Sequence, residues 1–389
     1  MRVVAVAHAY PRWDGDVAGA FIERLCTAIH HRNHLLTVVV PSDEGAGGKI
    51  VRNDIEILRA RYGLPSMEIL AYRGNMEEAA KSFMGLATVA SMIASQAAVT
   101  SLAVRERQAD LVHAHWWVPG GVSALLASIA SHRPFVLTLH GTDVAILKRS
   151  NVARRMARVV LRRAAFVTAV SSFLAKEAAT VAGLDPADII VQPMPLEVSR
   201  YSRLSTGGDG VVTVGRLTRQ KNIPVVLEAI ALLKKSGNPI SLKVVGDGPE
   251  RRALEHRATH LGIADLTRFV GAVPPEAVPD EIGNADVFAF PAIDEGLGLA
   301  AAEAFMLGVP VIAARQGGGV RDFVPPSGAG RLVDATDPVQ MSREIEAVIR
   351  HPEARALASE KGKELKDLLH PDSVAGLFED LYTQASSRA

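Results

Sequence analysis

The sequence predicts an α/β protein with two parallel-sheet domains in series, and three observations support this fold class. The chain has 389 residues, a length that favours two domains of ordinary size. Short apolar, β-branched runs alternate with longer helical patterns, as in parallel sheets that helices cover on both faces. The alternation stops in an irregular segment at 193–210 and then restarts. Hydrophobic residues make up 48% and charged residues 22%, which is typical of a globular protein.

The first domain is predicted to cover residues 1–195. Its strands are the apolar runs at 3–7, 36–40, 111–115, 135–140, 166–170 and 189–193, and helical patterns lie at 21–31 and 119–131. The uncharged run at 82–104 is long enough to span a membrane, but its many Ala, Ser and Thr residues make it weakly hydrophobic. We therefore expect a buried helix there rather than a transmembrane one.

The second domain is predicted to cover residues 196–370, after a linker rich in proline, glycine and serine. Its strands are expected at 211–215, 240–246, 267–271, 286–290 and 309–314, and its helices at 223–235, 249–261 and 299–307. Residues 371–389 form an amphipathic helix that is expected to pack back on the first domain. Ligands of parallel sheets bind beyond the carboxyl ends of the strands, so functional residues are expected in the loops that follow them.

Composition excludes several classes of function. Lys plus Arg is 43 and Asp plus Glu is 42, a balance that argues against a general nucleic-acid binder. The single cysteine, Cys26, excludes an intramolecular disulfide and a cysteine-cluster metal site. The N-terminal run MRVVAVAHAYP has too few apolar residues for a signal peptide, so a cytoplasmic protein is expected.

A basic loop, GRLTRQKN (215–222), directly follows one predicted strand of the second domain. Gly215 lets the backbone turn, and Arg216 and Lys221 can converge at the strand end. A guanidinium fork and a compact ammonium there suit a diphosphate. An ordinary exposed basic loop is the alternative.

Glu303 is the only polar residue in LAAAEAFML (299–307). A buried carboxylate without partners costs several kcal/mol or becomes protonated, so Glu303 needs hydrogen-bond donors, and a ribose diol would supply two. The alternatives are an exposed position or pairing with an arginine. Glu295 lies in a glycine turn whose amides open toward the helix N-terminus, where they can take a phosphate or sugar oxygen while Glu295 accepts sugar hydroxyls.

These motifs together resemble the retaining family-4 glycosyltransferases of GT-B fold. The resemblance follows the chain in order through LHGTD, GRLTRQKN, VVGDGPER, the E-x7-E pattern of EGLGLAAAEAF, and GVPVIAARQGGGVRDFV. YPRWDGDVAGAF, near the N-terminus, resembles the phosphate-side loop of some members. The resemblance implies two Rossmann-like domains facing a central cleft. It also implies a hexosyltransferase that uses a nucleotide-diphosphate sugar as co-substrate, without a metal or another cofactor.

The resemblance also implies residue roles. Arg216 and Lys221 would hold the donor diphosphate, Glu303 the ribose and Glu295 the transferred sugar, while His140 would contact the sugar near its anomeric centre. His140, Glu295, Arg216 and Lys221 form the predicted catalytic set. Further donor contacts are implied at Gly19, Gly215, Val273, Gly296, Leu297, Gly298 and Leu299.

The pattern departs from the family in places. Many members have paired glycines where this chain has Ala18-Gly19-Ala20, and a phenylalanine at Leu297. DGD (14–16) could be taken for a metal-binding DxD motif, but it lies in a glycine-containing loop after the first strand, so no metal site is predicted.

No carboxylate is clearly placed as a nucleophile, which favours a front-face mechanism in which the leaving phosphate assists acceptor deprotonation. The alternatives to a glycosyltransferase are a sugar phosphorylase, a nucleotide-sugar epimerase and a non-catalytic nucleotide-sugar binder.

The segment HAHWWVPGG (113–121) supplies acceptor candidates. Trp116 and Trp117 could stack on an acceptor sugar, or they could belong to the core. His115 and Asp143 are further acceptor candidates, whereas His113 is expected to pack within its strand.

Residues 144–176 contain no acid and eight basic residues, and Arg154, Arg158 and Arg162 recur every four positions. Segment 148–163 is therefore predicted to be a basic amphipathic helix that binds an anionic membrane surface, which would place the protein peripherally on the inner face of the membrane. A solvated face and a site for an anionic acceptor are the alternatives. The acceptor is expected to be a glycan, a lipid-linked sugar or a small molecule.

Overall fold

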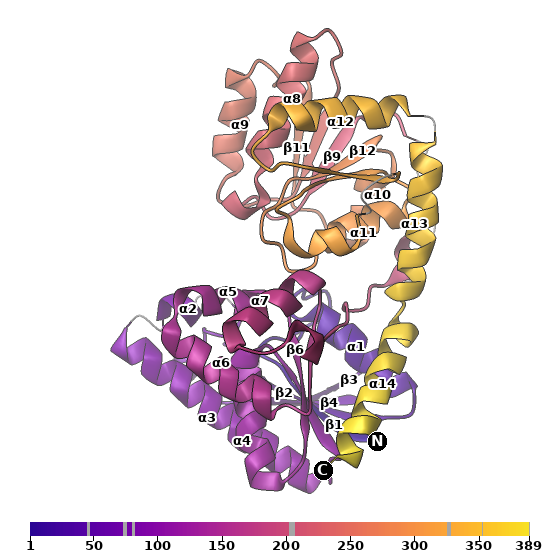
Figure 1. Cartoon of the computed structure of the whole chain (residues 1–389). Coiled ribbons are helices and arrows are strands. Elements are labelled where there is room, and N and C mark those ends of the chain that lie inside the picture. The colour runs from indigo at the N-terminus through magenta and orange to yellow at the C-terminus, as the bar shows by residue number, and fades with distance from the viewer. Residues whose placement is uncertain are drawn as a thin grey trace. The chain divides into compact units, whose positions relative to one another are not determined.

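The computed structural model describes residues 1–388, apart from 45–46, 73–75, 80–81, 202–206, 325–327 and 352 (Figure 1). Contacts divide the chain into unit 1, Met1–Leu196 with His370–Ala389, and unit 2, Glu197–Leu369. Each unit is an α/β structure around its own sheet, so the predicted fold class is confirmed. Of the predicted linker, residues 202–206 lie outside the described residues, and Val198–Tyr201 form a 3₁₀ turn.

Unit 1 is built on an eight-stranded sheet with the order β3-β4-β2-β1-β5-β6-β7-β8, and its neighbours are parallel except for the antiparallel hairpin β3–β4. The strands are β1 (Arg2–Val6), β2 (Leu35–Pro41), β3 (Gly48–Arg52), β4 (Ile55–Ala60), β5 (Leu111–His115), β6 (Phe135–Leu139), β7 (Phe166–Ala169) and β8 (Ile189–Val191). Both central strands β5 and β6 are buried at every residue, which is why their sequences are nearly continuous apolar runs.

Helices cover both faces of this sheet. α1 (Ala20–His31) contacts the C-terminal helix α14 (Pro371–Ser387), and α14 also contacts β5 and β6. A second group runs side by side in the order α3 (Phe83–Glu106), α4 (Val122–Ser131), α6 (Asn151–Arg163) and α7 (Ser172–Ala182). Two shorter helices are α2 (Met76–Ala79) and α5 (Thr142–Arg149).

Helix α3 differs from the buried helix expected at 82–104. Among the described residues it is the one helix long and apolar enough to cross a membrane by length and composition, yet only 39% of its most apolar window is buried. Met92, Gln96 and Thr100 are buried, whereas Phe83 and Leu86 are exposed. The expectation of full burial is therefore wrong, because α3 packs through one side only.

Unit 2 is built on a parallel six-stranded sheet with the order β11-β10-β9-β12-β13-β14. Its strands are β9 (Val211–Val214), β10 (Leu242–Val245), β11 (Thr267–Gly271), β12 (Val287–Phe290), β13 (Val311–Ala314) and β14 (Gly330–Val333). Its helices are α8 (Ile223–Lys235), α9 (Arg251–His260), α10 (Val278–Gly283), α11 (Leu299–Met306), α12 (Pro338–Arg350) and α13 (Ala354–Leu368). A buried core that includes Val226, Ile230 and Leu242 joins α8 to the sheet and leaves the loops after β9 and β12 at its carboxyl edge.

Candidate functional site

The loop after β9 carries the two predicted diphosphate cations. Gly215 has φ 152°, and a Cβ there would lie 3.2 Å from Cε of Lys221. Arg216 is exposed, and its side chain has no hydrogen bond or ion pair in the part of unit 2 that the structure describes. Lys221 ends a short 3₁₀ turn, and its Nζ lies 2.7 Å from Oε2 of Glu295. The structure thus pairs Lys221 with the predicted sugar-binding carboxylate and leaves Arg216 accessible to an anion.

Two glycines of the VVGDGPER motif make this loop compact. A Cβ on Gly246, which has φ 127°, would collide with the carbonyl oxygen of Gly215, and a Cβ on Gly248 would collide with that of Leu217. Backbone amides of Gly215 and Leu217 donate to the carbonyls of Val245 and Asp247, so the loops after β9 and β10 lie directly against each other.

Two side chains that no sequence motif indicated as functional join the loops after β9 and β12. Asn222, at φ 50°, donates from Nδ2 to the carbonyls of Pro291 at 3.3 Å and Ala335 at 2.8 Å. Gln220 donates from Nε2 to the carbonyl of Asp294 at 3.1 Å. The polar residues of GRLTRQKN therefore have two different roles. Arg216 and Lys221 are ligand candidates, whereas Gln220 and Asn222 position Lys221 opposite Glu295.

Helix α11 begins at Leu299, four positions after Glu295. Gly298 caps it at φ 79°, in the left-handed region, and a Cβ there would lie 2.8 Å from Cβ of Val320. The carbonyl of Glu295 accepts from the amide of Gly319 at 2.9 Å, while Leu297 is buried. A glycine is therefore required at 298 both by backbone conformation and by space.

Glu303 lies half-buried on α11, and its Oε1 accepts a hydrogen bond of 2.7 Å from the hydroxyl of Tyr201. Tyr201 is buried, at the end of the 3₁₀ turn that opens unit 2. The predicted need for a hydroxyl donor is thus met in part by a tyrosine that the sequence analysis did not single out. Of the other predicted donor residues, Gly296 lies in the turn before α11, Leu299 is the first residue of α11, and Val273 lies half-exposed after β11.

In unit 1, Asp143 organises the loop that carries His140. Its Oδ1 accepts from the backbone amides of His140 and Gly141 at 3.2 and 2.9 Å, and its Oδ2 accepts from that of Trp117 at 3.1 Å. Burial raises the pKa of Asp143, while these amide bonds act to lower it. Asp143 is buried and fully engaged with backbone, so its geometry fits a positioning role and not the predicted acceptor contact.

The predicted aromatic acceptor residues are also buried. Trp117 donates from Nε1 to the carbonyl of Asp143 at 2.7 Å, and its ring lies in the core. Trp116 is buried between His8 and His140, with ring centroids 4.6 and 4.7 Å away. Of the two alternatives for these tryptophans, burial supports the core.

Four histidines gather at the carboxyl edge of this sheet. Nδ1 of His115 lies 3.1 Å from Nε2 of His140, and His113 contacts the hydroxyl of Tyr382 through Nδ1 at 2.6 Å. Burial lowers the pKa of His8 to about 4 and that of His115 to about 3, and it lowers those of His113 and His140 well below their usual range. The cluster is therefore neutral at pH 7. His8 and His140 are half-buried, whereas His113 and His115 are fully buried. His115, predicted as an acceptor contact, is instead the buried neighbour of His140.

The N-terminal loop ends at Gly19, which caps α1 with φ 73°. A Cβ there would collide with the carbonyl of Ala9, so the single glycine of Ala18-Gly19-Ala20 is required by the close approach of two backbone segments.

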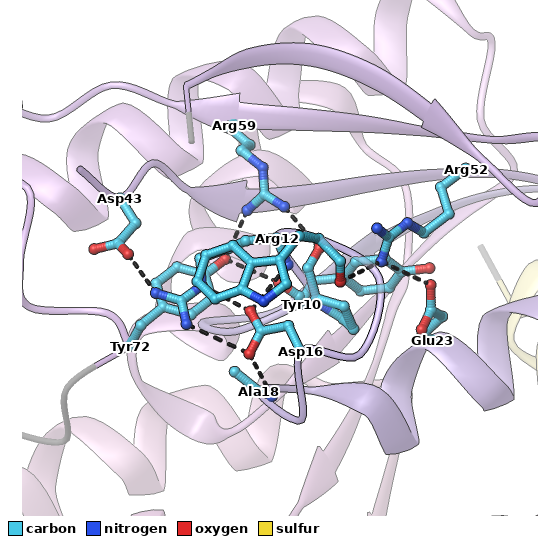
Figure 2. Close-up of polar contacts among 11 residues, drawn as sticks. Tyr10, Arg12, Asp16, Ala18, Glu23, Asp43, Arg52, Arg59 and Tyr72 are labelled. Carbon is cyan, nitrogen blue, oxygen red and sulfur yellow. Dashed lines mark hydrogen bonds and ion pairs between the residues drawn. The ribbon is translucent and has the colours of Figure 1, made fainter. Parts of the chain in front are cut away.

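Figure 2 shows how charged residues hold this loop. Arg12 contacts Asp16 at 2.7 Å and Asp43 at 2.6 Å, and its guanidinium lies over the ring of Tyr72. Arg59 donates to the carbonyl of Pro11 at 2.8 Å. Asp16 of the DGD sequence is thus engaged by an arginine. Among the described residues, no group of three or more His, Cys, Asp or Glu side chains could hold a metal ion.

Family models match both units. The model for glycosyl transferases group 1 matches residues 200–365, and that for the glycosyl transferase 4-like domain matches residues 18–195. These two matched ranges contain Arg216, Lys221, Glu295, Glu303 and His140.

Curated relatives and solved structures agree with those matches. The chain is 33% identical over 238 residues to the putative teichuronic acid biosynthesis glycosyltransferase TuaC of Bacillus subtilis, covering 58% of each chain. It is 29% identical to the 2-deoxystreptamine glucosyltransferase of Streptomyces kanamyceticus, covering 70% of this chain and 77% of the relative. Anabaena Alr3699/HepE, solved in complex with UDP, has a TM-score of 0.75 and 19% identity over 98% of this chain and 100% of that one. This last likeness shows the GT-B fold alone.

Proposed function

The chain belongs to the glycosyl transferases group 1 family, and we propose that it transfers a hexose-type sugar from a nucleotide-diphosphate donor to an acceptor hydroxyl with retention of anomeric configuration. The observation that carries this proposal is the juxtaposition, at the carboxyl edge of one sheet, of an accessible Arg216 with the Lys221–Glu295 pair and the start of α11. Two cations and a carboxylate fit a diphosphate joined to a polyol.

Each residue of unit 2 has a distinct role in the proposal. Arg216 binds the diphosphate, and Lys221 exchanges part of its contact with Glu295 for a phosphate oxygen. Glu295 then accepts hydroxyls of the transferred sugar, while Glu303 accepts ribose hydroxyls beside Tyr201. Because positive charge gathers where the leaving group becomes more negative, Arg216 and Lys221 stabilise the transition state more than the ground state.

In the transfer step, the bond from the anomeric carbon to the phosphate oxygen breaks as a bond to the acceptor oxygen forms on the same face. The acceptor proton passes to the leaving phosphate. His140 donates a hydrogen bond to an oxygen of the sugar, and no residue forms a covalent adduct. The acceptor is a glycan, a lipid-linked sugar or a small molecule.

A binding comparison tests the division of labour between the two glutamates. We expect Glu303→Ala to weaken binding of the bare nucleoside diphosphate about tenfold or more, because a charge-assisted hydrogen bond contributes roughly 1.5–3 kcal/mol. Glu295→Ala should change that affinity little but lower kcat strongly. Calorimetric titration of the nucleotide giving the largest thermal stabilisation in a nucleotide-sugar screen provides the measurement.

Tyr201→Phe is the matched control, because it removes the partner of Glu303 but keeps the carboxylate. It should weaken the nucleotide less than Glu303→Ala does. Equal losses of nucleoside diphosphate affinity for the two glutamate variants would contradict the assignment. Product analysis separates the alternative functions, since a requirement for inorganic phosphate indicates a phosphorylase and an epimer formed without acceptor indicates an epimerase.

A further inference from the structure

Helix α3 presents an uncharged outer surface. From Phe83 to Val104 it has no Asp, Glu, Lys or Arg, and its exposed side chains include Phe83, which is 92% exposed, and Leu86, which is 55% exposed. Met84, Leu102 and four alanines are also exposed along this uncharged part of the helix. A continuous apolar helix surface of this kind is rarely left in water by a soluble protein and indicates an interaction site.

Two neighbouring helices extend this surface. α4 contacts both α3 and α6 (Figure 1). It exposes Leu126 and Ile129. On α6, Val152, Met156 and Val159 are exposed at a spacing of four and three residues, so they form one stripe. We define the apolar face as the exposed large apolar side chains of these three helices, which are Phe83, Met84, Leu86, Leu102, Leu126, Ile129, Val152, Met156 and Val159.

The arginines of α6 differ in whether they have a partner, which corrects the face predicted from the sequence, and Arg154 donates to Oδ1 of Asn151. Arg158 and Arg162 donate to the carbonyls of Ala182 and Gly183, at 2.7 and 3.1 Å, and so complete the C-terminus of α7. Arg155 and Arg163 are exposed, and neither has a hydrogen bond or ion pair in the described part of the chain. The arginines of α6 whose side chains have no protein partner among the residues that the structure describes therefore lie beside the apolar stripe and not on the face of Arg154, Arg158 and Arg162.

We propose that the apolar face docks on an anionic lipid bilayer, with its apolar side chains in the headgroup–acyl boundary and Arg155 and Arg163 on lipid phosphates. An apolar stripe flanked by arginine is the pattern of helices that lie in a membrane interface. A second copy of the chain fits less well, because α4 and α6 contain no acidic residue to meet the arginines of a partner. The proposal concerns unit 1 alone and does not depend on the proposed transfer reaction.

Cosedimentation of the full chain with vesicles tests the proposal. The protein should bind vesicles of phosphatidylglycerol and phosphatidylcholine, bind pure phosphatidylcholine far less, and be released from the anionic vesicles by salt. Arg155→Gln with Arg163→Gln should weaken binding about twenty-five-fold, since each basic residue near the surface contributes roughly a factor of five. Phe83→Ser with Leu86→Ser should weaken it by about tenfold or more, since apolar area no longer leaves water.

The matched control is Arg252→Gln with Arg343→Gln, two exposed arginines of unit 2 whose removal changes the net charge equally. This control should bind vesicles as the unaltered chain does, and thermal unfolding should show that all three variants remain folded. No binding to anionic vesicles, or equal losses in the control, would overturn the proposal. So would a dimer in sedimentation velocity that Phe83→Ser with Leu86→Ser makes monomeric while vesicle binding is unchanged, because that result assigns the face to a second copy.

Discussion

At the scale of single residues, the protonation of His140 follows from its buried neighbour. Neutral His115 carries one ring proton, and its Nε2 is buried without a hydrogen-bond partner in the described part of the chain. A proton on Nε2 would be an orphaned buried N–H, which is rarer and more costly than an unpaired acceptor. The proton therefore resides on Nδ1 of His115 and is donated to Nε2 of His140, 3.1 Å away. This leaves the proton of His140 on its Nδ1, where the ring is a hydrogen-bond donor for a ligand.

We predict that His115→Phe removes the hydrogen bond that fixes the tautomer of His140. Nitrogen-15 NMR of the unaltered chain without ligand should show His140 as the Nδ1–H tautomer, and the variant should show a mixture of the two neutral tautomers. With the preferred donor, kcat should fall about tenfold, as expected for one misplaced hydrogen bond, with little change in KM. His31→Phe, at an exposed position of the same unit, is the control and should leave both readouts unchanged. An Nε2–H tautomer of His140 in the unaltered chain would refute the assignment, whatever the activity.

At the scale of elements, the N-terminal loop keeps its shape through one arginine. The side chains of Arg12, Asp16 and Asp43 are 17%, 5% and 4% exposed, so both carboxylates depend on that guanidinium for charge compensation. The hydrogen bond to Asp16 raises the pKa of Arg12 further, so it stays charged at every working pH. Removing it would leave two buried carboxylates facing each other, next to the segment that places Gly19 at the start of α1.

Arg12→Ala should therefore lower the free energy of unfolding by about 3 kcal/mol, the range for breaking a buried ion pair. Arg12→Lys should lose less, because it keeps the charge but cannot contact both carboxylates as a fork. Urea denaturation followed by tryptophan fluorescence measures both. Asp14→Ala is the control in the same loop, since the Asp14 carboxylate that pairs with Arg52 is fully exposed and should contribute under about 0.5 kcal/mol. Equal effects of Arg12→Ala and Asp14→Ala would show that the loop does not depend on Arg12.

Elements with one strong periodic signal could be predicted from the sequence, and elements fixed by local turn chemistry or distant contacts could not. The runs at 111–115 and 223–235 coincide with β5 and α8, because continuous burial and helical spacing each leave a clear pattern. Hairpin β3–β4 was missed because its strands are mixed in polarity. Its signal lay in Asn53-Asp54, both at positive φ, as a tight two-residue hairpin turn requires.

The candidate site divides in the same way. The positions of Arg216, Lys221 and Glu295 after strands follow from the parallel-sheet rule, since the carboxyl ends of such strands share one edge. Tyr201 could not be predicted as the partner of Glu303, because 102 positions separate them and only the folding of unit 2 brings them together. The same limit applies to α3, whose composition indicates apolarity but not which side another element covers.

At the scale of the whole molecule, the two units should respond differently to acid. His8, His113, His115 and His140 all belong to unit 1, and burial lowers the pKa of each. A histidine whose pKa is lower in the folded than in the unfolded protein contributes its full stability above its unfolded pKa, which is about 6.5. That contribution is lost as the pH falls toward the pKa of the folded state. Because the pKa of Asp143 is raised, its contribution to stability changes with pH in the opposite direction, but it is a single group against four histidines. The histidines of unit 2, at 256, 260 and 351, are exposed.

We therefore predict that unit 1 loses stability between pH 6.5 and about 4, by up to roughly 1.4 kcal/mol per pH unit for each of these four histidines. All three tryptophans, Trp13, Trp116 and Trp117, lie in unit 1, so their fluorescence reports that unit alone, whereas far-ultraviolet circular dichroism reports both. Urea midpoints from fluorescence should fall steeply from pH 7 to 5. A second transition, seen by circular dichroism without a fluorescence change, should move less over the same range. A fluorescence midpoint that is constant between pH 7 and 5 would contradict this prediction. It would mean that the histidines take up protons equally well in the folded and the unfolded protein.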